Sequence, residues 1–189
     1  TDVSSDAEPP LGTILHLHTV PSQGGDTLFA NMYAAFEALS PAMQQFLASL
    51  RAVHTLDYNA LYGRAGHREN PRSVHPVVRT HPVTGRNALF VNPGFTERIE
   101  GLTREESDAL LQYLFRHAEQ PQFQCRFKWE RLSLAMWDDR CTWHRALWDY
   151  YPETRSGLRV TVRGDRPFFD PSTSTTASGG TAGPNSRAA

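Results

Sequence analysis

The feature that most limits the fold of this chain is a series of short segments with the two-residue alternation of β-strands. The clearest is residues 13–20, TILHLHTV, in which apolar and polar side chains alternate before a proline. These segments do not alternate with helices, so a parallel α/β sheet fits less well than a β-sandwich or barrel decorated by helices. Further strands are predicted at 27–29, 52–56, 75–80, 87–91, 122–129, 133–137 and 158–163.

Three helices are predicted from local signals. An apolar stripe indicates a helix over residues 31–39. Ser40 is a good capping residue and is followed by proline at the first helical position, which predicts a second helix over 41–50. The sequence TREE at 103–106 is a capping box and predicts a third helix that ends near His117.

Composition excludes several classes of protein. The 189 residues carry 19 basic and 20 acidic side chains, a net charge of −1, which gives no electrostatic basis for binding nucleic acid or a membrane surface. The apolar runs are far shorter than the roughly 20 residues of a membrane span. The two cysteines exclude a disulfide-dense secreted scaffold. With no leader pattern visible at the start, we expect a cytoplasmic protein.

Two regions stand apart from the β-rich pattern. Residues 57–74 hold glycines, charges and a proline without periodicity, and a loop of this length inside a domain is usually functional or mobile. Residues 170–189 consist largely of Ser, Thr, Gly, Ala and Pro, which predicts a disordered tail. The folded domain is therefore expected to span residues 1–169.

His144 is the first residue with a chemical interpretation. It lies just after a predicted strand, in a polar stretch bounded by aromatic residues. A mononuclear non-haem iron site needs two imidazoles and one carboxylate, and His144 could supply one imidazole. Cys141 and His144 also have the C-x-x-H spacing, but no second cysteine pair is present for a structural zinc site. Taken by itself, His144 fits a solvated loop histidine better than a ligand.

A pair of arginines near the end of the domain has two interpretations. Arg155 and Arg159 are four residues apart, so they point to the same face of an extended strand. Facing inward, two guanidinium groups could bind a dianionic or sulfonated ligand through bidentate hydrogen bonds. The strand period alone, however, favours a basic outer face. Asp2 and Thr27 carry no distinguishing signal by themselves.

Several of these stretches together resemble the taurine dioxygenase family. They are PSQGGDTL at 21–28, AAFEAL at 34–39, HPVVRTHPVTGR at 75–86, ALFVN at 88–92 and the block from 137 to 167. The resemblance runs from residue 1 to about 169. It implies a mainly β fold with flanking helices, built as a double-stranded β-helix, the cupin-like jelly-roll barrel. It also implies an enzyme that uses Fe(II), with 2-oxoglutarate as cosubstrate and O2.

The implied reaction couples decarboxylation of 2-oxoglutarate to succinate with hydroxylation of a small, anionic substrate: a sulfonate, a sulfate ester or a carboxylate. The resemblance also implies roles for individual residues. Asp2 and His144 would be metal ligands, with Asp2 as the carboxylate of a His-x-Asp motif. The histidine of that motif is expected immediately before Thr1, so we expect this chain to start inside the motif.

The same resemblance assigns the cosubstrate and substrate contacts. Thr27 would hydrogen-bond the distal carboxylate of 2-oxoglutarate, and Arg155 would form an ion pair with it. Arg159 would face the anionic group of the substrate, with Val3 and Phe95 near the pocket wall. Two departures argue against taurine itself as the substrate: Ser5 stands where the family often has an aromatic residue, and the stretch RALW at 145–148 differs from that of taurine dioxygenase.

Two alternatives stay open. One is an oxygenase with the same cosubstrate that acts on an amino acid or a secondary metabolite, with residues 57–74 as a specificity lid. The other is a non-catalytic jelly-roll module with a degraded iron site, which binds a small ligand or a partner. The expected partner is a small molecule, and family habit leaves a homo-oligomer open.

Overall fold

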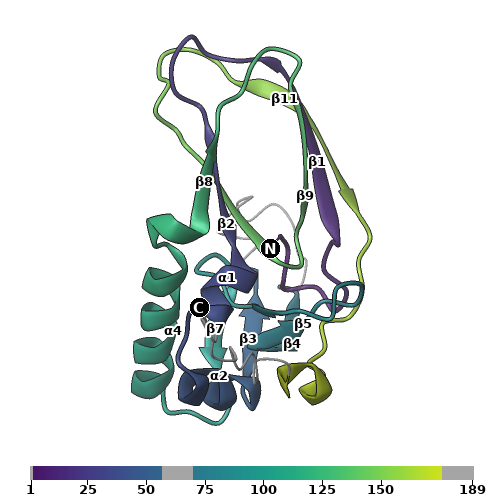
Figure 1. Ribbon diagram of the computed structural model, residues 1–189. Helices are drawn as coiled ribbons and strands as arrows, with labels where there is room; N and C mark the ends of the chain where they lie inside the picture. The colour runs from purple at the N-terminus through teal and green to yellow at the C-terminus, as the bar shows by residue number, and fades with distance from the viewer. Residues whose placement is uncertain (1, 57–69, 176–189) are drawn as a thin grey trace, which may run out of the picture.

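The structure is a computed structural model, and it describes residues 2–56 and 70–175. Most of the predicted loop, residues 57–69, and the end of the predicted tail, residues 176–189, lie outside the described residues. Strands predominate, and the helices gather at one end of the molecule (Figure 1). Every strand pair is antiparallel, which excludes a parallel α/β sheet for the described residues.

Two three-stranded sheets form the upper part of the molecule in Figure 1. Each has a central strand from the start of the chain and outer strands from its second half. The first sheet places β1 (Gly12–Thr19) between β9 (Leu134–Asp138) and β11 (Ser156–Val162). The second places β2 (Thr27–Asn31) between β8 (Gln124–Phe127) and β10 (Thr142–Ala146).

The two sheets face each other through aromatic side chains. The ring centroids of Phe29 in β2 and Trp137 in β9 are 5.2 Å apart. Within the described residues the strands β8, β9, β10 and β11 each pair on one side only, so the sheets do not close into a hydrogen-bonded barrel. The expected mainly β fold with helices is therefore confirmed, whereas the closed jelly-roll barrel is not seen.

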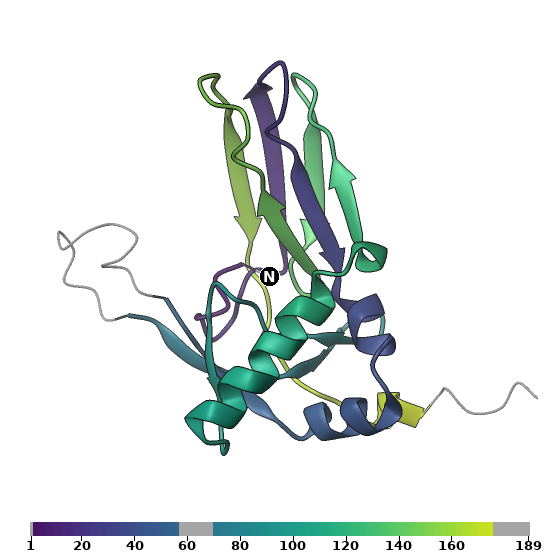
Figure 2. The ribbon, with the colours of Figure 1, turned by 90° about the vertical axis from the view of Figure 1, so that its left-hand side faces the viewer.

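The lower part of the molecule, which we call the helical part, contains the helices and the remaining strands (Figure 2). It holds the main apolar core. Its helices are α1 (Met32–Glu37), α2 (Pro41–Ala48) and α4 (Arg104–Ala118). Its strands are β3 (Arg51–Thr55), β4 (Arg72–Pro76), β5 (Val78–Thr80), β6 (Asn87–Leu89) and β7 (Thr96–Ile99), paired as β4-β3-β7 and β5-β6. Fully buried side chains from both kinds of element fill this core, among them Met32, Leu47, Leu89, Ile99 and Leu114.

The helices begin where the local signals predict. Ser40 Oγ accepts a hydrogen bond from the backbone N–H of Met43 at 3.3 Å, at the start of α2. At the start of α4, Thr103 Oγ1 accepts from the Glu106 N–H at 3.3 Å, and the Thr103 N–H donates to the Glu106 carboxylate at 2.9 Å. This reciprocal pair is the predicted capping box.

Some strands differ from the prediction because their pairing is non-local. The predicted strand 75–80 is interrupted at Val77, whose N–H donates to Leu50 O instead of a ladder partner. The predicted strand 122–129 begins with a short 3-10 helix, η1 (Pro121–Phe123). Strand β10 was not predicted; it is held by pairing along its whole length with β2. Strand β7 was missed for the same reason, since its partner is β3.

The beginning of the predicted tail contacts the folded part of the molecule. Pro171–Thr175 forms a 3-10 helix, η2, and the Asp170 N–H donates to Thr80 Oγ1 at 2.9 Å. These contacts lie just beyond residue 169, the predicted end of the folded domain. None of the helices in the described parts of the chain has both the length and the apolar character needed to cross a membrane.

Candidate active site

His144 lies in the middle of β10, on the face that looks toward the other sheet. Its ring centroid is 4.9 Å from that of Trp137 and 6.5 Å from that of Phe29, its cross-strand partner. Burial lowers the pKa of His144 to about 4, so the imidazole is neutral near pH 7. Its Nδ1 atom is buried without a hydrogen-bond partner in the described residues. The solvated-loop interpretation is therefore wrong, and a neutral imidazole is the form that binds metals.

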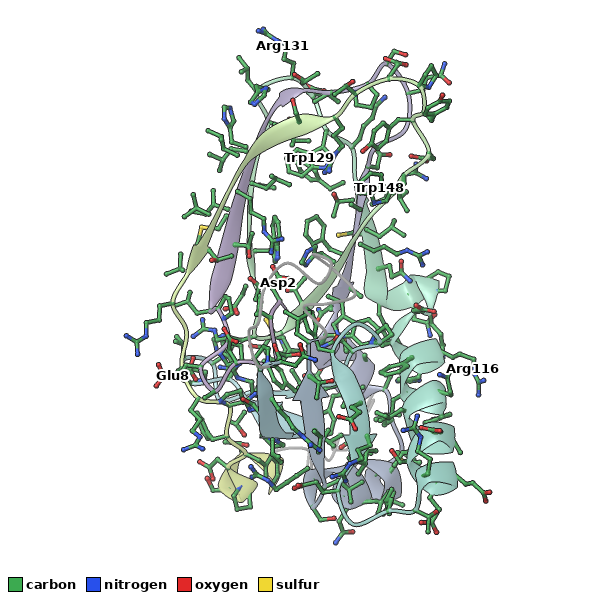
Figure 3. The ribbon with its side chains drawn as sticks, turned by 180° about the vertical axis from the view of Figure 1, so that it is seen from behind. Asp2, Glu8, Arg116, Trp129, Arg131 and Trp148 are labelled. Atoms are coloured by element: carbon green, nitrogen blue, oxygen red, sulfur yellow. The ribbon has the colours of Figure 1, made fainter. Side chains whose placement is uncertain are left out.

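Asp2 reaches the same cavity as His144. Figure 3 shows Asp2 between the two sheets, near their junction with the helical part. A cavity of about 520 Å³ is lined by Asp2, His144, Phe95 and Trp143, among others. The Asp2 carboxylate forms an ion pair with Arg159. The structure thus brings one carboxylate and one imidazole to a single cavity, and these are donor types that non-haem iron takes.

Arg155 and Arg159 both point toward the space between the two sheets. Arg159 contacts Asp2, and Arg155, just before the strand, donates to Thr27 Oγ1 at 3.3 Å. The opposite face of β11 is apolar and exposed: Leu158 is 68% and Val160 60% exposed. The basic outer face favoured by the strand period alone is therefore wrong. Alternation separates the two faces of a strand, but the polar partners available between the sheets decide which face turns inward.

Thr27 and Arg155 come together with a residue that the sequence did not single out. Thr27 is 2% and Trp129 3% exposed, and the indole Nε1–H of Trp129 donates to Thr27 Oγ1 at 3.0 Å. The Arg155 guanidinium lies over the Trp129 ring, 5.5 Å from its centroid. Arg155 Nε is buried and unpartnered among the described residues. A half-buried guanidinium whose Nε–H has no partner among the described residues, beside a hydroxyl, is a suitable site for a carboxylate.

This pair lies a short way along the sheet from His144. Thr27 and Phe29 are on the same face of β2, and His144 is opposite Phe29. Two residues of a strand span about 7 Å. Thr27 and Arg155 are therefore separated from the His144 imidazole by roughly the length of a small dicarboxylate.

The two residues expected at the pocket wall have different positions. Phe95 is half-buried and lines the cavity with Asp2 and His144. Val3 is half-buried next to Asp2, has a positive φ of 46°, and is not among the residues that line this cavity. Asn92 lines the cavity too and was not predicted, although it closes the ALFVN motif. No local signal distinguishes Trp129 from other aromatic residues at strand ends.

Comparison with known proteins decides the family. The sequence pattern of the family described as "Taurine catabolism dioxygenase TauD, TfdA family" matches residues 1–161. The chain belongs to this family.

Individual members of the TauD, TfdA family support the assignment. An alpha-ketoglutarate-dependent sulfonate dioxygenase of Saccharomyces cerevisiae is 38% identical over 176 residues, which cover 90% of this chain and 43% of the relative. An alpha-ketoglutarate-dependent sulfate ester dioxygenase of Pseudomonas putida is 33% identical over 180 residues, 88% of this chain and 60% of the relative. The chain thus spans about half the length of these curated relatives.

A solved structure agrees with the family at the level of the fold. The crystal structure of a taurine dioxygenase from Burkholderia xenovorans superposes with a TM-score of 0.81 at 40% sequence identity. The superposition covers 88% of this chain and 57% of that one.

A second group of metal-binding residue types lies elsewhere in this TauD, TfdA family member. His81, Asp138 and Cys141 are the one set of three such side chains found close together in the described residues. Burial raises the pKa of Asp138, but hydrogen bonds from Arg140 and His81 outweigh this effect and lower it to about 2. Arg140 bonds both carboxylate oxygens, and His81 Nδ1 accepts from two backbone N–H groups. These contacts explain why the three side chains lie close together, since His81 and Asp138 belong to an ion-pair network with Arg140. The group does not include Asp2 or His144.

Proposed function

We propose that this protein is an Fe(II)- and 2-oxoglutarate-dependent dioxygenase that hydroxylates a small anionic substrate. One observation carries the proposal: Asp2 and His144 share a cavity, while Thr27 and Arg155 meet about two strand residues away. The spacing matches a cosubstrate that binds a metal at one end and a hydroxyl and guanidinium at the other. Membership of the TauD, TfdA family supports the same assignment.

Asp2 and His144 would hold the iron. The donor set fits, because His144 is neutral and has a buried nitrogen with no partner among the residues that the structure describes, and Asp2 supplies a carboxylate at the same cavity. The third ligand of the triad would be a histidine, which the family resemblance places immediately before Thr1. When bound, Fe(II) supplies the oxidation of a substrate C–H bond by O2, coupled to decarboxylation of 2-oxoglutarate.

Thr27 and Arg155 would bind the far carboxylate of 2-oxoglutarate. Thr27 Oγ1 accepts hydrogen bonds from Trp129 and Arg155, so its own hydroxyl hydrogen is available to a carboxylate oxygen. The Arg155 Nε–H, which has no partner in the described parts of the chain, would supply a charge-assisted bond. Trp129 covers the pair from solvent, which would strengthen these bonds. A cosubstrate held in this way would have its keto acid end directed toward His144.

Arg159 would bind the anionic group of the substrate. Its guanidinium adjoins Asp2, and its side chain is 42% exposed, so part of it is free to contact a sulfonate or sulfate oxygen. Sulfonate and sulfate ester are the substrate classes in the names of the two relatives, which supports this class here. We further infer that the two facing sheets are parts of one jelly-roll domain, for which the structural likeness to the taurine dioxygenase is the support.

The test is an anaerobic titration with Fe(II) and 2-oxoglutarate, followed by visible charge-transfer absorbance. The titration compares two forms of this chain. One carries a histidine added directly before Thr1, and the matched control carries an alanine at the same place. We expect the band in the histidine form only, and we expect His144→Ala or Asp2→Ala to abolish it. A folded histidine form without the band would overturn the proposal.

A further inference from the structure

A buried hydrogen-bond network beside the cavity centres on Asn92. We propose that Asn92 is a positioning residue. It holds the Asp2 segment, residues 2–8, and the Phe95 loop, residues 93–95, in one fixed arrangement. The inference rests on the proposed function, because it gives Asp2 and Phe95 their roles. Asn92 itself contacts neither metal nor cosubstrate in that proposal.

Asn92 bonds to both segments with one side chain that is 6% exposed. Its Oδ1 accepts from the backbone N–H of Gly94 at 3.1 Å and of Phe95 at 2.8 Å. Its Nδ2 donates to Ser4 Oγ at 3.0 Å. Because backbone N–H groups can only donate, the carbonyl end must face the Phe95 loop, and the amide has a single orientation.

The Ser4 side of this network is also fully buried. Ser4 and His54 are each 0% exposed, and Ser4 Oγ is hydrogen-bonded to His54 Nδ1 of β3 at 2.9 Å. On the neighbouring strand β4, His75 Nε2 donates to the backbone carbonyl of Asp6 at 2.9 Å. Two histidines from adjacent strands of the helical part therefore hold the segment that follows Asp2.

This anchoring explains an unfavourable backbone conformation. Val3 has a φ of 46°, and β-branched residues rarely adopt positive φ because the side chain crowds the backbone. Such a conformation persists only where the surroundings over-determine it. Ser4, the next residue, supplies that constraint, and the conformation of Val3 sets the direction in which Asp2 leaves the segment.

The arrangement has a consequence for the cavity. Asp2, two residues before Ser4, and Phe95, bonded through its own N–H to Asn92, line the same cavity. The side-chain amide of Asn92 thus fixes the position of Asp2, a proposed metal ligand, relative to Phe95 at the proposed wall of the substrate pocket. A shift of either segment would change the distance between the substrate and the metal while leaving Thr27 and Arg155 in place.

The first test is hydrogen–deuterium exchange on the 189-residue chain. Asn92→Ala should raise exchange about tenfold or more in peptides covering 3–8 and 93–97, because it removes bonds to both segments. Ser4→Ala, a smaller change, should raise exchange in 3–8 alone. The matched control is Asn87→Ala: Asn87 is 8% exposed and accepts from Thr80 Oγ1 at 2.7 Å, away from both segments.

The outcomes are distinct. Coupled loosening of both segments in Asn92→Ala, with neither affected by Asn87→Ala, supports the proposal. Loosening of one segment only, or equal loosening in the control, overturns it. If Asn92→Ala does not fold, unchanged exchange over 3–8 in Ser4→Ala overturns it as well.

The second test uses the histidine-extended chain and its charge-transfer band. Ser4→Ala and Asn92→Ala should weaken Fe(II) binding about tenfold, whereas the 2-oxoglutarate concentration that gives half the band should not change. Asn87→Ala should change neither. Absence of the band in the unsubstituted chain would count against the proposed function, while the exchange experiment would still decide the role of Asn92.

Discussion

The hydrogen bond between Thr27 and Trp129 allows the contribution of Thr27 to stability to be measured separately from its proposed role in binding 2-oxoglutarate. Thr27→Val keeps the shape of the side chain but removes Thr27 Oγ1, which accepts from the indole N–H of Trp129 at 3.0 Å. Trp129 is only 3% exposed, so its N–H would be left buried without an acceptor. An unpaired buried donor costs about 1–3 kcal/mol of folding free energy. Trp129→Phe removes the donor itself, so this penalty cannot arise in the double variant.

The double-mutant cycle therefore has a predicted sign and size. The loss of stability in Thr27→Val with Trp129→Phe should be smaller than the sum of the single losses by on the order of 1–2 kcal/mol. The assay is urea unfolding followed by far-UV circular dichroism, since replacing a tryptophan changes the fluorescence. Equal m-values across the four proteins would show that the unfolded states are comparable.

A matched cycle gives the control. Thr13 is as deeply buried as Thr27 and donates to Asp139 at 2.5 Å, so Thr13→Val shares no partner with Trp129. Its combination with Trp129→Phe should be additive to within about 0.5 kcal/mol. Equal additivity in the Thr27 cycle would refute the reasoning. Thr27→Val and its double variant with Trp129→Phe both lack the Thr27 hydroxyl. Both should bind 2-oxoglutarate weakly, even though the double variant avoids the stability penalty of the unpaired indole N–H.

Three further predictions concern pH, packing and the substrate. The pKa of His144 is lowered to about 4 and that of His54 to about 3, so the unfolded chain binds more protons and stability should fall as pH drops from 6.5 toward 4. For His144 this loss is on the order of 3 kcal/mol, and urea unfolding of His144→Gln should show a correspondingly shallower pH dependence. Gly157→Ala places a Cβ against the backbone of His16 on the paired strand, and thermal unfolding should reveal a loss of about 1–3 kcal/mol; an unchanged melting temperature would contradict the close approach. Arg159→Gln should raise the KM of an organic-anion substrate, followed by succinate release; an unchanged KM would make Arg159 structural.

Elements with local causes could be predicted from the sequence. The start of α2 at Ser40 and the capping box at Thr103 depend on contacts within four residues, so the sequence pattern is sufficient to locate them. Strand β1 was also predicted, because its alternating apolar and polar side chains indicate a strand with one face toward the interior. The resemblance to a family supplied Thr27 and Arg155 as a pair, and the structure places them in contact.

Other features were decided by tertiary structure because their partners are distant in the chain. Strand β10, which carries His144, exists through its pairing with β2 more than 100 residues earlier. The inward direction of Arg159 follows from Asp2 between the sheets, since a strand period distinguishes two faces without saying which is buried. Asn92 meets Ser4 across 88 residues. The sequence determined where the chain could form helices and strands and which residue types it offers; only packing determined which of them meet.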